Sequence, residues 1–254
     1  MDVRVLGSSG GVGNGKGTTS LLIDDDILID AGTGVAQLSI DELSRLRHVF
    51  LTHSHLDHIA YLPLLGDTVF GLIPESVKVY ALPETLDALR RHIFNDTIWP
   101  DFTRIPNKHE PVFRFQPLLP GEVLRLGARS VEAISVNHTV PCMGYRVEGG
   151  EGAFAISGDT TCNDSFWEAL NAHPNLDFLL VETAFSNKDE RLAHIARHYC
   201  PRLLAVDLGK LRHRPRIYII HAKPGEESAI LRECRELLAE RDVSGLAGGA
   251  HFTL

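Results

Sequence analysis

A short segment rich in histidine and aspartate separates two apolar runs in the first quarter of the chain. It reads His53-Ser54-His55-Leu56-Asp57-His58 and stands between the apolar residues 49–51 and 59–65. A strand that ends in a turn projects His53 and His55 to one side, whereas Asp57 and His58 on the first turn of a following helix point to a neighbouring centre. Zinc and similar ions accept imidazole and carboxylate ligands. The segment therefore predicts a metal centre at a strand-to-helix junction, and a solvated polar turn is the alternative.

One such segment cannot fill the coordination shells of two ions, so two ions would need further ligands from downstream. Three candidates each stand just after a predicted strand: His138 follows the run 130–136, Asp159 follows 153–156, and His221 follows 217–220. Each of them alone is weak evidence, because a lone histidine at a strand end is more often structural or solvated. Together with the first segment they complete a set of donors for two ions.

The composition is ordinary for a globular protein except for its 13 histidines in 254 residues. Apolar residues make up 44% and charged residues 23%, which excludes disordered, collagen-like and membrane-spanning classes. The length fits a single domain, which we place over residues 1–254. Four cysteines without a C-x-x-C pair are expected to be reduced and mostly buried. The Gly-rich N-terminal segment lacks the apolar core of a secretory signal, so we expect a cytoplasmic protein.

With a formal net charge of −8, the chain has no overall positive electrostatic field that would attract a polyanion. We therefore expect no DNA partner, and the charge disfavours RNA. No run of 18 apolar residues occurs in the sequence, so we expect no membrane partner either.

Short β-rich runs alternate with amphipathic helical stretches along the whole chain. The expected strands are 3–6, 20–23, 27–30, 48–51, 110–115, 123–126, 130–136, 142–147, 153–156, 178–182 and 216–220. The expected helices are 36–45, 164–172, stretches between 189 and 211, and 224–240. Two β-rich halves, each followed by helices, predict two packed sheets with helices outside.

A glycine-rich segment, residues 10–17 with the sequence GGVGNGKG, matches the pattern of a phosphate-binding loop except at its last position. Such a loop requires Ser or Thr at its eighth position and a helix directly after it. Here Gly17 occupies that position and two predicted strands follow. The segment therefore predicts a loop that lines a pocket rather than a nucleotide-triphosphate site.

The donor set in its chain order resembles that of the metallo-β-lactamase superfamily. The resemblance implies an α+β four-layer αβ/βα sandwich with metals at one edge of the two sheets. Carried over residue by residue, it assigns His53, His55 and His138 to one ion, Asp57, His58 and His221 to the other, and Asp159 to a bridge between them. Two divalent ions are implied, Zn²⁺ first, with Mn²⁺ and Fe²⁺ as alternatives.

Further segments resemble the class II cyclic-nucleotide phosphodiesterases of that superfamily. They are residues 58–65, 93–100, 182–185 and 198–201, the last followed by several leucines. The resemblance implies a hydrolase that converts 3′,5′-cyclic AMP or GMP to 5′-monophosphates by means of a metal-bridging hydroxide. Its substrate would be a small anion, and the family implies a homodimer.

Three alternatives remain: a ribonuclease Z-like nuclease, another phosphodiester or ester hydrolase of the superfamily, and a nucleotide-binding module without activity. The basic arm with which ribonuclease Z grips tRNA has no counterpart here, and the net charge lacks the electrostatic attraction that holds a long polyanion.

Candidate catalytic groups lie beside the metal ligands in this interpretation. An alkoxide leaves readily only when it is protonated, and His198 is the candidate general acid. Glu182 would orient it, and Asp57 is counted both as a ligand and as a catalytic group. His194 is a weaker substitute for His198, with a solvated helix residue as the alternative. Asp30, at the end of a predicted strand, is a candidate partner for a ligand histidine.

The stretch 90–111 supplies two candidate substrate contacts. Trp99 could stack on a base and Asn95 could read its edge, although such aromatic residues are often simply core. Arg146 and Lys223 are further candidates for contact with a phosphate, and a solvated surface position is the alternative for each.

Overall fold

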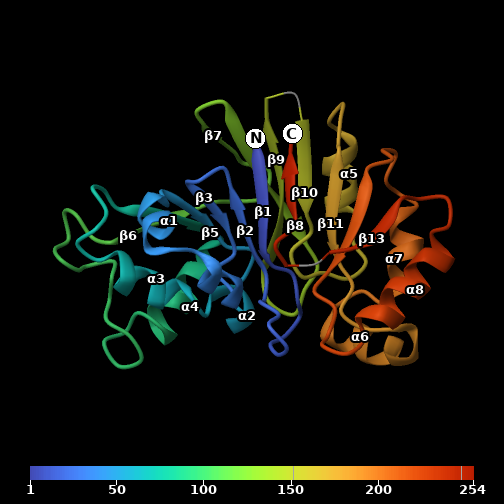
Figure 1. Cartoon of the computed structure of the whole chain (residues 1–254), viewed down its shortest axis with the longest axis horizontal. Helices are drawn as coiled ribbons and strands as arrows, with labels where there is room; N and C mark the ends of the chain where they lie inside the picture. The colour runs from blue at the N-terminus through green and yellow to red at the C-terminus, as the bar shows by residue number, and fades with distance from the viewer. Residues whose placement is uncertain (151, 247) are drawn as a thin grey trace.

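The computed structural model describes residues 1–150, 152–246 and 248–254, within which the strands form two mixed seven-stranded sheets (Figure 1). The first has the order β14-β1-β2-β3-β4-β5-β6, formed by β1 (Asp2–Gly7), β2 (Ser20–Ile23), β3 (Ile27–Ile29), β4 (His48–Phe50), β5 (Val77–Ala81), β6 (Phe113–Pro117) and β14 (His251–Thr253). The second has the order β13-β12-β11-β10-β9-β8-β7, formed by β7 (Val123–Leu126), β8 (Arg129–Val136), β9 (Cys142–Gly149), β10 (Gly152–Ile156), β11 (Phe178–Glu182), β12 (Arg216–Ile220) and β13 (Val243–Gly245).

Strand direction brings several carboxyl ends to one edge of the second sheet. The strand β9 pairs antiparallel with both β8 and β10, whereas β11 pairs parallel with both β10 and β12. Because β8 and β10 both run opposite to β9, β8 points the same way as β10, β11 and β12. The residues that follow these four strands therefore meet at the same edge.

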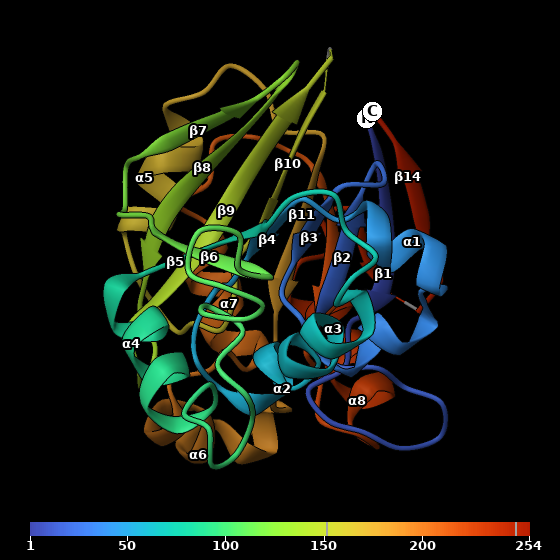
Figure 2. The ribbon, with the colours of Figure 1, turned by 90° about the vertical axis from the view of Figure 1, so that its left-hand side faces the viewer.

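Helices cover the outer face of each sheet. They are α1 (Ile40–Arg45), α2 (Leu56–Ile59), α3 (Leu62–Val69), α4 (Pro83–His92), α5 (Ser165–Asn171), α6 (Glu190–Ala196), α7 (Pro201–Leu208) and α8 (Glu227–Leu237), with the 3₁₀ turns η1 (Thr33–Gln37) and η2 (Asn187–Asp189). Figures 1 and 2 show α1, α3 and α4 outside the first sheet, and α5, α7 and α8 outside the second.

Three apolar cores correspond to these layers. The core between the sheets contains Phe50 and Phe154. A second core, which contains Leu86, lies under the helices of the first sheet, and a third, which contains Trp167, lies under those of the second. This order of helix, sheet, sheet and helix confirms the expected α+β four-layer sandwich.

Most of the expected elements are present, and several bounds differ. The single helix expected over 36–45 is wrong, because η1 ends at Gln37 and α1 begins only after Ser39, which caps its N-terminus. The strand expected over 110–115 begins at Phe113, since Pro111 has no N–H to give to a ladder. The structure adds β5, α3 and α4, which were not expected, and the short strands β13 and β14.

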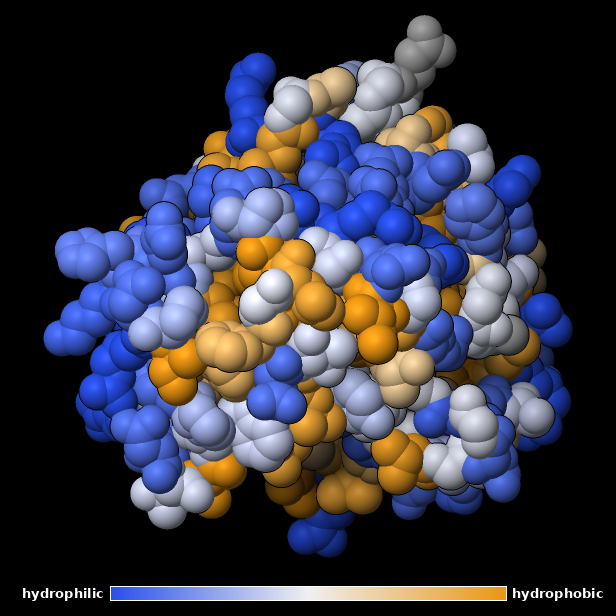
Figure 3. Space-filling model, turned by 60° about the vertical axis from the view of Figure 1, so that its left-hand side comes forward, coloured by the Kyte–Doolittle hydropathy of each residue, from blue (hydrophilic) through white to orange (hydrophobic). Residues whose placement is uncertain are grey.

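The remaining expectations concern thiols and surface. All four cysteines are free, and Cys142, Cys200 and Cys234 are buried. Along the described stretches, no helix combines the length and the apolar composition needed to cross a bilayer. The face in Figure 3 mixes apolar with hydrophilic side chains, and the exposed apolar residues of the first half include Leu64 and Phe70.

Candidate metal centre

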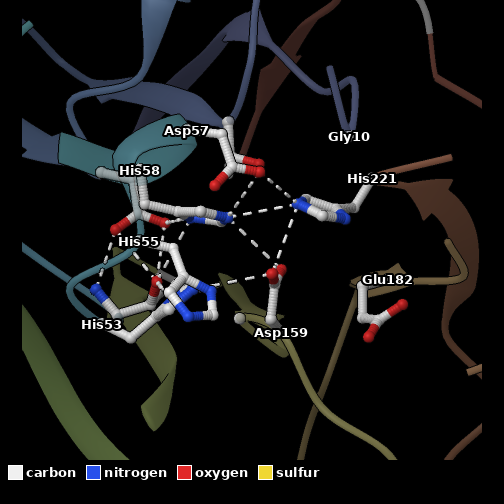
Figure 4. Close-up of polar contacts among 12 residues, drawn as sticks. Gly10, His53, His55, Asp57, His58, Asp159, Glu182 and His221 are labelled. Atoms are coloured by element: carbon white, nitrogen blue, oxygen red, sulfur yellow. Dashed lines mark hydrogen bonds and ion pairs between the residues drawn. The ribbon is translucent and has the colours of Figure 1, made fainter. Parts of the chain in front are cut away.

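Histidine and aspartate side chains from both halves of the chain converge at one edge of the two sheets (Figure 4). His53 follows β4, and His55 is the residue that precedes the first turn of α2. The residues 57 and 58 lie in α2 itself. From the second sheet, His138 follows β8, Asp159 follows β10 and His221 follows β12. The strand-end positions expected from the sequence are therefore the positions that the fold brings together.

These side chains form two groups that could each hold a metal ion. One group is His53, His55, His138 and Asp159, and the other is Asp57, His58, Asp159 and His221. Within each group, one ligand atom per residue lies within 4.8 Å of the others. Asp159 belongs to both, with its Oδ2 3.6 Å from His53 Nε2 and 3.3 Å from His221 Nε2, and its Oδ1 3.4 Å from His58 Nε2. The two groups are those that the resemblance assigned.

The donor atoms fit a divalent cation. His53 Nε2 is buried and has no hydrogen-bond partner among the described residues, although buried polar atoms are normally paired. His58 Nε2 and His221 Nε2 lie only 3.3 Å apart. Imidazole nitrogens and carboxylate oxygens that face one another in this way suit Zn²⁺, Mn²⁺ and Fe²⁺.

For His53, His138 and Asp57, the electrostatic environment favours the protonation states in which these groups bind cations. Burial holds the pKa of His53 well below its ordinary value and lowers the pKa of His138 to about 4, so both rings are neutral near pH 7. Burial alone would raise the pKa of Asp57, but its hydrogen bond with His221 and the charge of His58 lower it below the usual range. Metal ligands need neutral imidazole and ionised carboxylate.

Hydrogen bonds to the distal ring nitrogens orient several of the histidines. His58 Nδ1 lies 2.6 Å from Asp30 Oδ2, so Asp30 contacts a candidate ligand histidine. His53 Nδ1 lies 3.0 Å from Thr52 Oγ1. Such partners fix ring orientation.

Arg197 holds His138 in a reciprocal contact that the sequence does not indicate. The carbonyl of Arg197 lies 3.0 Å from His138 Nδ1, and the Arg197 guanidinium donates to the carbonyl of His138 at 2.8 Å. Arg197 follows α6 in the left-handed conformation, with φ of 51°. No sequence motif indicates such a backbone contact, so sequence reasoning could not have found it.

His198 and Glu182 form a buried pair beside the metal-facing groups. His198 Nδ1 lies 2.8 Å from Glu182 Oε1, and the His198 ring is 4.9 Å from that of His138 and 5.4 Å from that of His221. Burial alone would lower the pKa of His198, but the charge and hydrogen bond of Glu182 raise it above its ordinary value. Glu182 therefore favours the protonated form of a buried imidazole beside the candidate metal ligands, whereas His194 is exposed.

Asn95 and Trp99 lie on the loop after α4, and their described contacts are local. The Asn95 side chain donates to the carbonyl of Arg91 at 2.9 Å and accepts from the backbone N–H of Thr97 and Ile98. Trp99 packs against the core beneath the first-sheet helices. Neither has a described contact with a metal-facing side chain.

The two candidate phosphate contacts have different surroundings. Arg146 is buried in β9 and donates to Glu148, so the expectation of a solvated surface position is wrong for it. Lys223 is half-buried, and its ammonium donates to the carbonyl of Gly10 at 2.9 Å.

The glycine-rich segment leads into β2 rather than into a helix. Gly15, Lys16 and Gly17 line a cavity of about 400 Å³ together with residues of β12 and α8, as expected for a loop that lines a pocket.

Comparison with known proteins extends these observations. The family model described as "Beta-lactamase superfamily domain" matches residues 25–240. The chain is 26% identical to a "Probable 3′,5′-cyclic-nucleotide phosphodiesterase" of Yersinia pestis, with 100% of this chain and 87% of the relative covered. It is 33% identical to a ribonuclease Z of Bradyrhizobium sp., over 44% of this chain and 36% of the relative.

Among solved structures, unliganded yeast PDE1 has the same fold. The TM-score is 0.82 at 20% identity, and 98% of each chain is covered. The family match covers most of the chain, and the fold and the histidine and aspartate cluster agree with it. This chain therefore belongs to the metallo-β-lactamase superfamily and is a hydrolase whose fold implies divalent metal ions.

Proposed function

We propose that this protein is a dinuclear-metal phosphodiesterase that hydrolyses 3′,5′-cyclic nucleotides to 5′-monophosphates. The observation that carries the proposal is the pair of ligand groups that share Asp159, with the buried His198–Glu182 pair beside them. The relative of Yersinia pestis, which aligns over the whole chain, supports the substrate class.

In this proposal His53, His55, His138 and Asp159 hold one ion, and Asp57, His58, His221 and Asp159 hold the other. When bound, such a pair of ions would lower the pKa of water toward neutrality and offset the charge of the phosphoryl oxygens. Zn²⁺ is proposed, with Mn²⁺ and Fe²⁺ as alternatives.

His198 is the proposed proton donor to the leaving O3′ of the substrate. Its Nδ1 is held by Glu182 at 2.8 Å, which leaves Nε2 as the ring nitrogen that can deliver a proton. Glu182 also accepts from the backbone N–H of Thr160 and Ala184, each at 3.0 Å. These bonds fix the carboxylate, and the carboxylate in turn fixes the imidazole.

The remaining parts of the proposal concern substrate contacts and cellular context. Asn95 and Trp99 are proposed to contact the base, with the Trp99 ring as a stacking surface. Residues 1–254 are proposed to form one domain that acts as a cytoplasmic homodimer on a small anionic substrate, without DNA or membrane partners and with RNA disfavoured.

A ribonuclease Z-like activity is the second candidate, because relatives of that name match part of the chain. Purified protein loaded with Zn²⁺ or Mn²⁺ should be incubated separately with cyclic AMP, cyclic GMP, a 3′-extended tRNA, a thioester and bis-p-nitrophenyl phosphate. We expect 5′-AMP or 5′-GMP to appear, and the Asp159→Ala variant to be inactive. Hydrolysis of the generic diester but of neither cyclic nucleotide would defeat the proposal, and trimming of the tRNA alone would favour the nuclease.

A further inference from the structure

The glycine-rich segment 10–17 has no role in the proposed function, yet its first residue lies against a metal-facing histidine (Figure 4). The backbone N–H of His221 donates to the carbonyl of Ser8 at 2.7 Å, and the N–H of Gly10 donates to the carbonyl of Ala222 at 3.0 Å. These two backbone hydrogen bonds hold residues 8–10 against residues 221–222.

Position 10 has no room for a side chain. A Cβ atom built there would lie 2.3 Å from the carbonyl oxygen of His221 and 3.0 Å from His221 Nδ1. Real Cβ atoms essentially never approach below 3.0 Å, and a backbone oxygen cannot rotate away as a flexible side chain can. Any residue larger than glycine must therefore displace the backbone of His221.

The backbone of His221 is itself in an unfavourable conformation, with φ of 61°. A histidine keeps a left-handed conformation only when its surroundings enforce it. The described contacts that hold it are the hydrogen bonds to residues 8–10, together with those that join the flanking Ile220 and Lys223 to residues 183–184. Lys223 Nζ, 2.9 Å from the carbonyl of Gly10, holds that segment in place as well.

The ring of His221 lacks the hydrogen bond that orients other histidines of the centre. His58 Nδ1 has Asp30 at 2.6 Å and His138 Nδ1 has the carbonyl of Arg197 at 3.0 Å. In contrast, His221 Nδ1 is buried and has no hydrogen-bond partner among the residues that the structure describes. The direction of His221 Nε2, 3.1 Å from Asp57 Oδ2, therefore depends on its backbone, on packing against Gly10 and on stacking with the rings of His58 and His198.

We infer that Gly10 is a positioning residue for His221, and that its missing side chain is required for the second metal site. The inference rests on the proposed function, because it takes His221 as a ligand of the second ion. A larger residue at position 10 should lower the affinity for that second ion selectively, because the histidines of the first group are held by other elements.

The test is Gly10→Ala, with Val12→Ala as the matched control on the same loop. Val12 is 65% exposed. The number of Zn²⁺ ions bound and their affinities should be measured by competition with a chromophoric chelator. We expect wild type and Val12→Ala to bind two ions alike. Gly10→Ala should bind the first ion as wild type does and the second about 10–100-fold more weakly, which is the usual effect of losing an outer-sphere contact.

A His221→Gln variant separates this inference from the proposed function. If His221→Gln binds two ions like wild type, the ligand assignment itself is wrong. If it loses the second ion while Gly10→Ala keeps both at wild-type affinity, or weakens both equally, the role of Gly10 is overturned.

Circular dichroism of the metal-free proteins shows whether Gly10→Ala folds. If it does not, Lys223→Met decides, because it releases the Gly10 carbonyl without adding atoms at position 10. Weaker binding of the second ion by Lys223→Met then supports the inference, and unchanged affinity for both ions overturns it.

Discussion

His194 and His198 lie four residues apart and have opposite surroundings. On a continuous helix they would share one face. The helix α6 ends at Ala196, however, and Arg197 takes φ of 51°, so the chain turns before His198. As a result His198 is buried against Glu182, whereas His194 stays exposed. The turn at a single residue decides which of the two histidines lies beside the candidate metal ligands.

The substitution His198→Ala should lower kcat for cyclic nucleotides by about 10²–10⁴-fold, the usual contribution of a general acid. Turnover of bis-p-nitrophenyl phosphate should change much less, because nitrophenolate leaves without being protonated. Steady-state kinetics on both substrates and metal analysis by mass spectrometry check this.

His194→Ala is the matched control and should behave like wild type in both assays. Normal turnover of cyclic nucleotides by a metal-replete His198→Ala protein would remove His198 from the mechanism. An equal loss on both substrates would show that His198 does not act by protonating the leaving group.

The stability of short helices in this fold depends on how their end residues are capped. The helix α1 has only six residues, and a capping box closes its first turn: Glu42 N donates to Ser39 Oγ at 3.3 Å, and Ser39 N donates to Glu42 Oε2 at 2.8 Å. Arg4 of β1 donates to the same carboxylate at 2.7 Å. Capping satisfies backbone groups that a helix this short could not otherwise pair.

This capping predicts a pH-dependent contribution of α1 to stability. The hydrogen bond from Ser39, followed by that from Arg4, lowers the pKa of Glu42 to about 2 from its ordinary 4.5. A carboxylate with a depressed pKa stabilises the fold above pH 4.5, and this stabilisation is lost as the pH falls toward 2. Glu42→Gln should therefore cost about 1 kcal/mol at pH 7, since partial exposure screens the charges, and less at pH 3.

Urea unfolding of wild type and Glu42→Gln at the two pH values measures the difference. Asp41→Asn removes one charge from the same turn without breaking these bonds, and should cost only a few tenths of a kcal/mol. A Glu42→Gln cost that is equal at pH 7 and pH 3 would contradict the prediction.

At the scale of the whole molecule, the metal centre joins the two sheets. The candidate ligands His53, His55, Asp57 and His58 come from the first sheet and its helix α2, whereas the candidates His138, Asp159 and His221 follow strands of the second. Ions bound at this edge would tie together segments more than 160 residues apart, such as Asp57 and His221.

Metal loading should therefore stabilise the whole fold. An ion present at 100 times its Kd contributes about 2.7 kcal/mol, which corresponds to a rise in Tm of about 5–10 °C for a protein of this size. Chelation should lower the Tm by that amount, and added Zn²⁺ should restore it in a calorimetric scan. Asp159→Asn should show a smaller shift, because its side chain serves both groups. A Tm that does not respond to chelator or to Zn²⁺ would contradict a site that bridges the sheets.

The sequence by itself determined the ligand-bearing strand ends. The segment 53–58 and the positions of His138, Asp159 and His221 can be read locally, because apolar runs predict strands and the polar residues directly follow them. The resemblance then supplied the grouping of candidate ligands, and in the structure the side chains of each proposed group lie together.

Other features were decided only by the tertiary structure. The strand β14 pairs with β1 from the opposite end of the chain, Arg197 holds His138, and Gly10 packs against His221. None of these contacts has a local signature, because each depends on backbone atoms of segments that are far apart in the sequence and meet only in the folded chain. A residue pattern encodes strands, turns and donor types, whereas the orientation of each donor is fixed by contacts between distant segments.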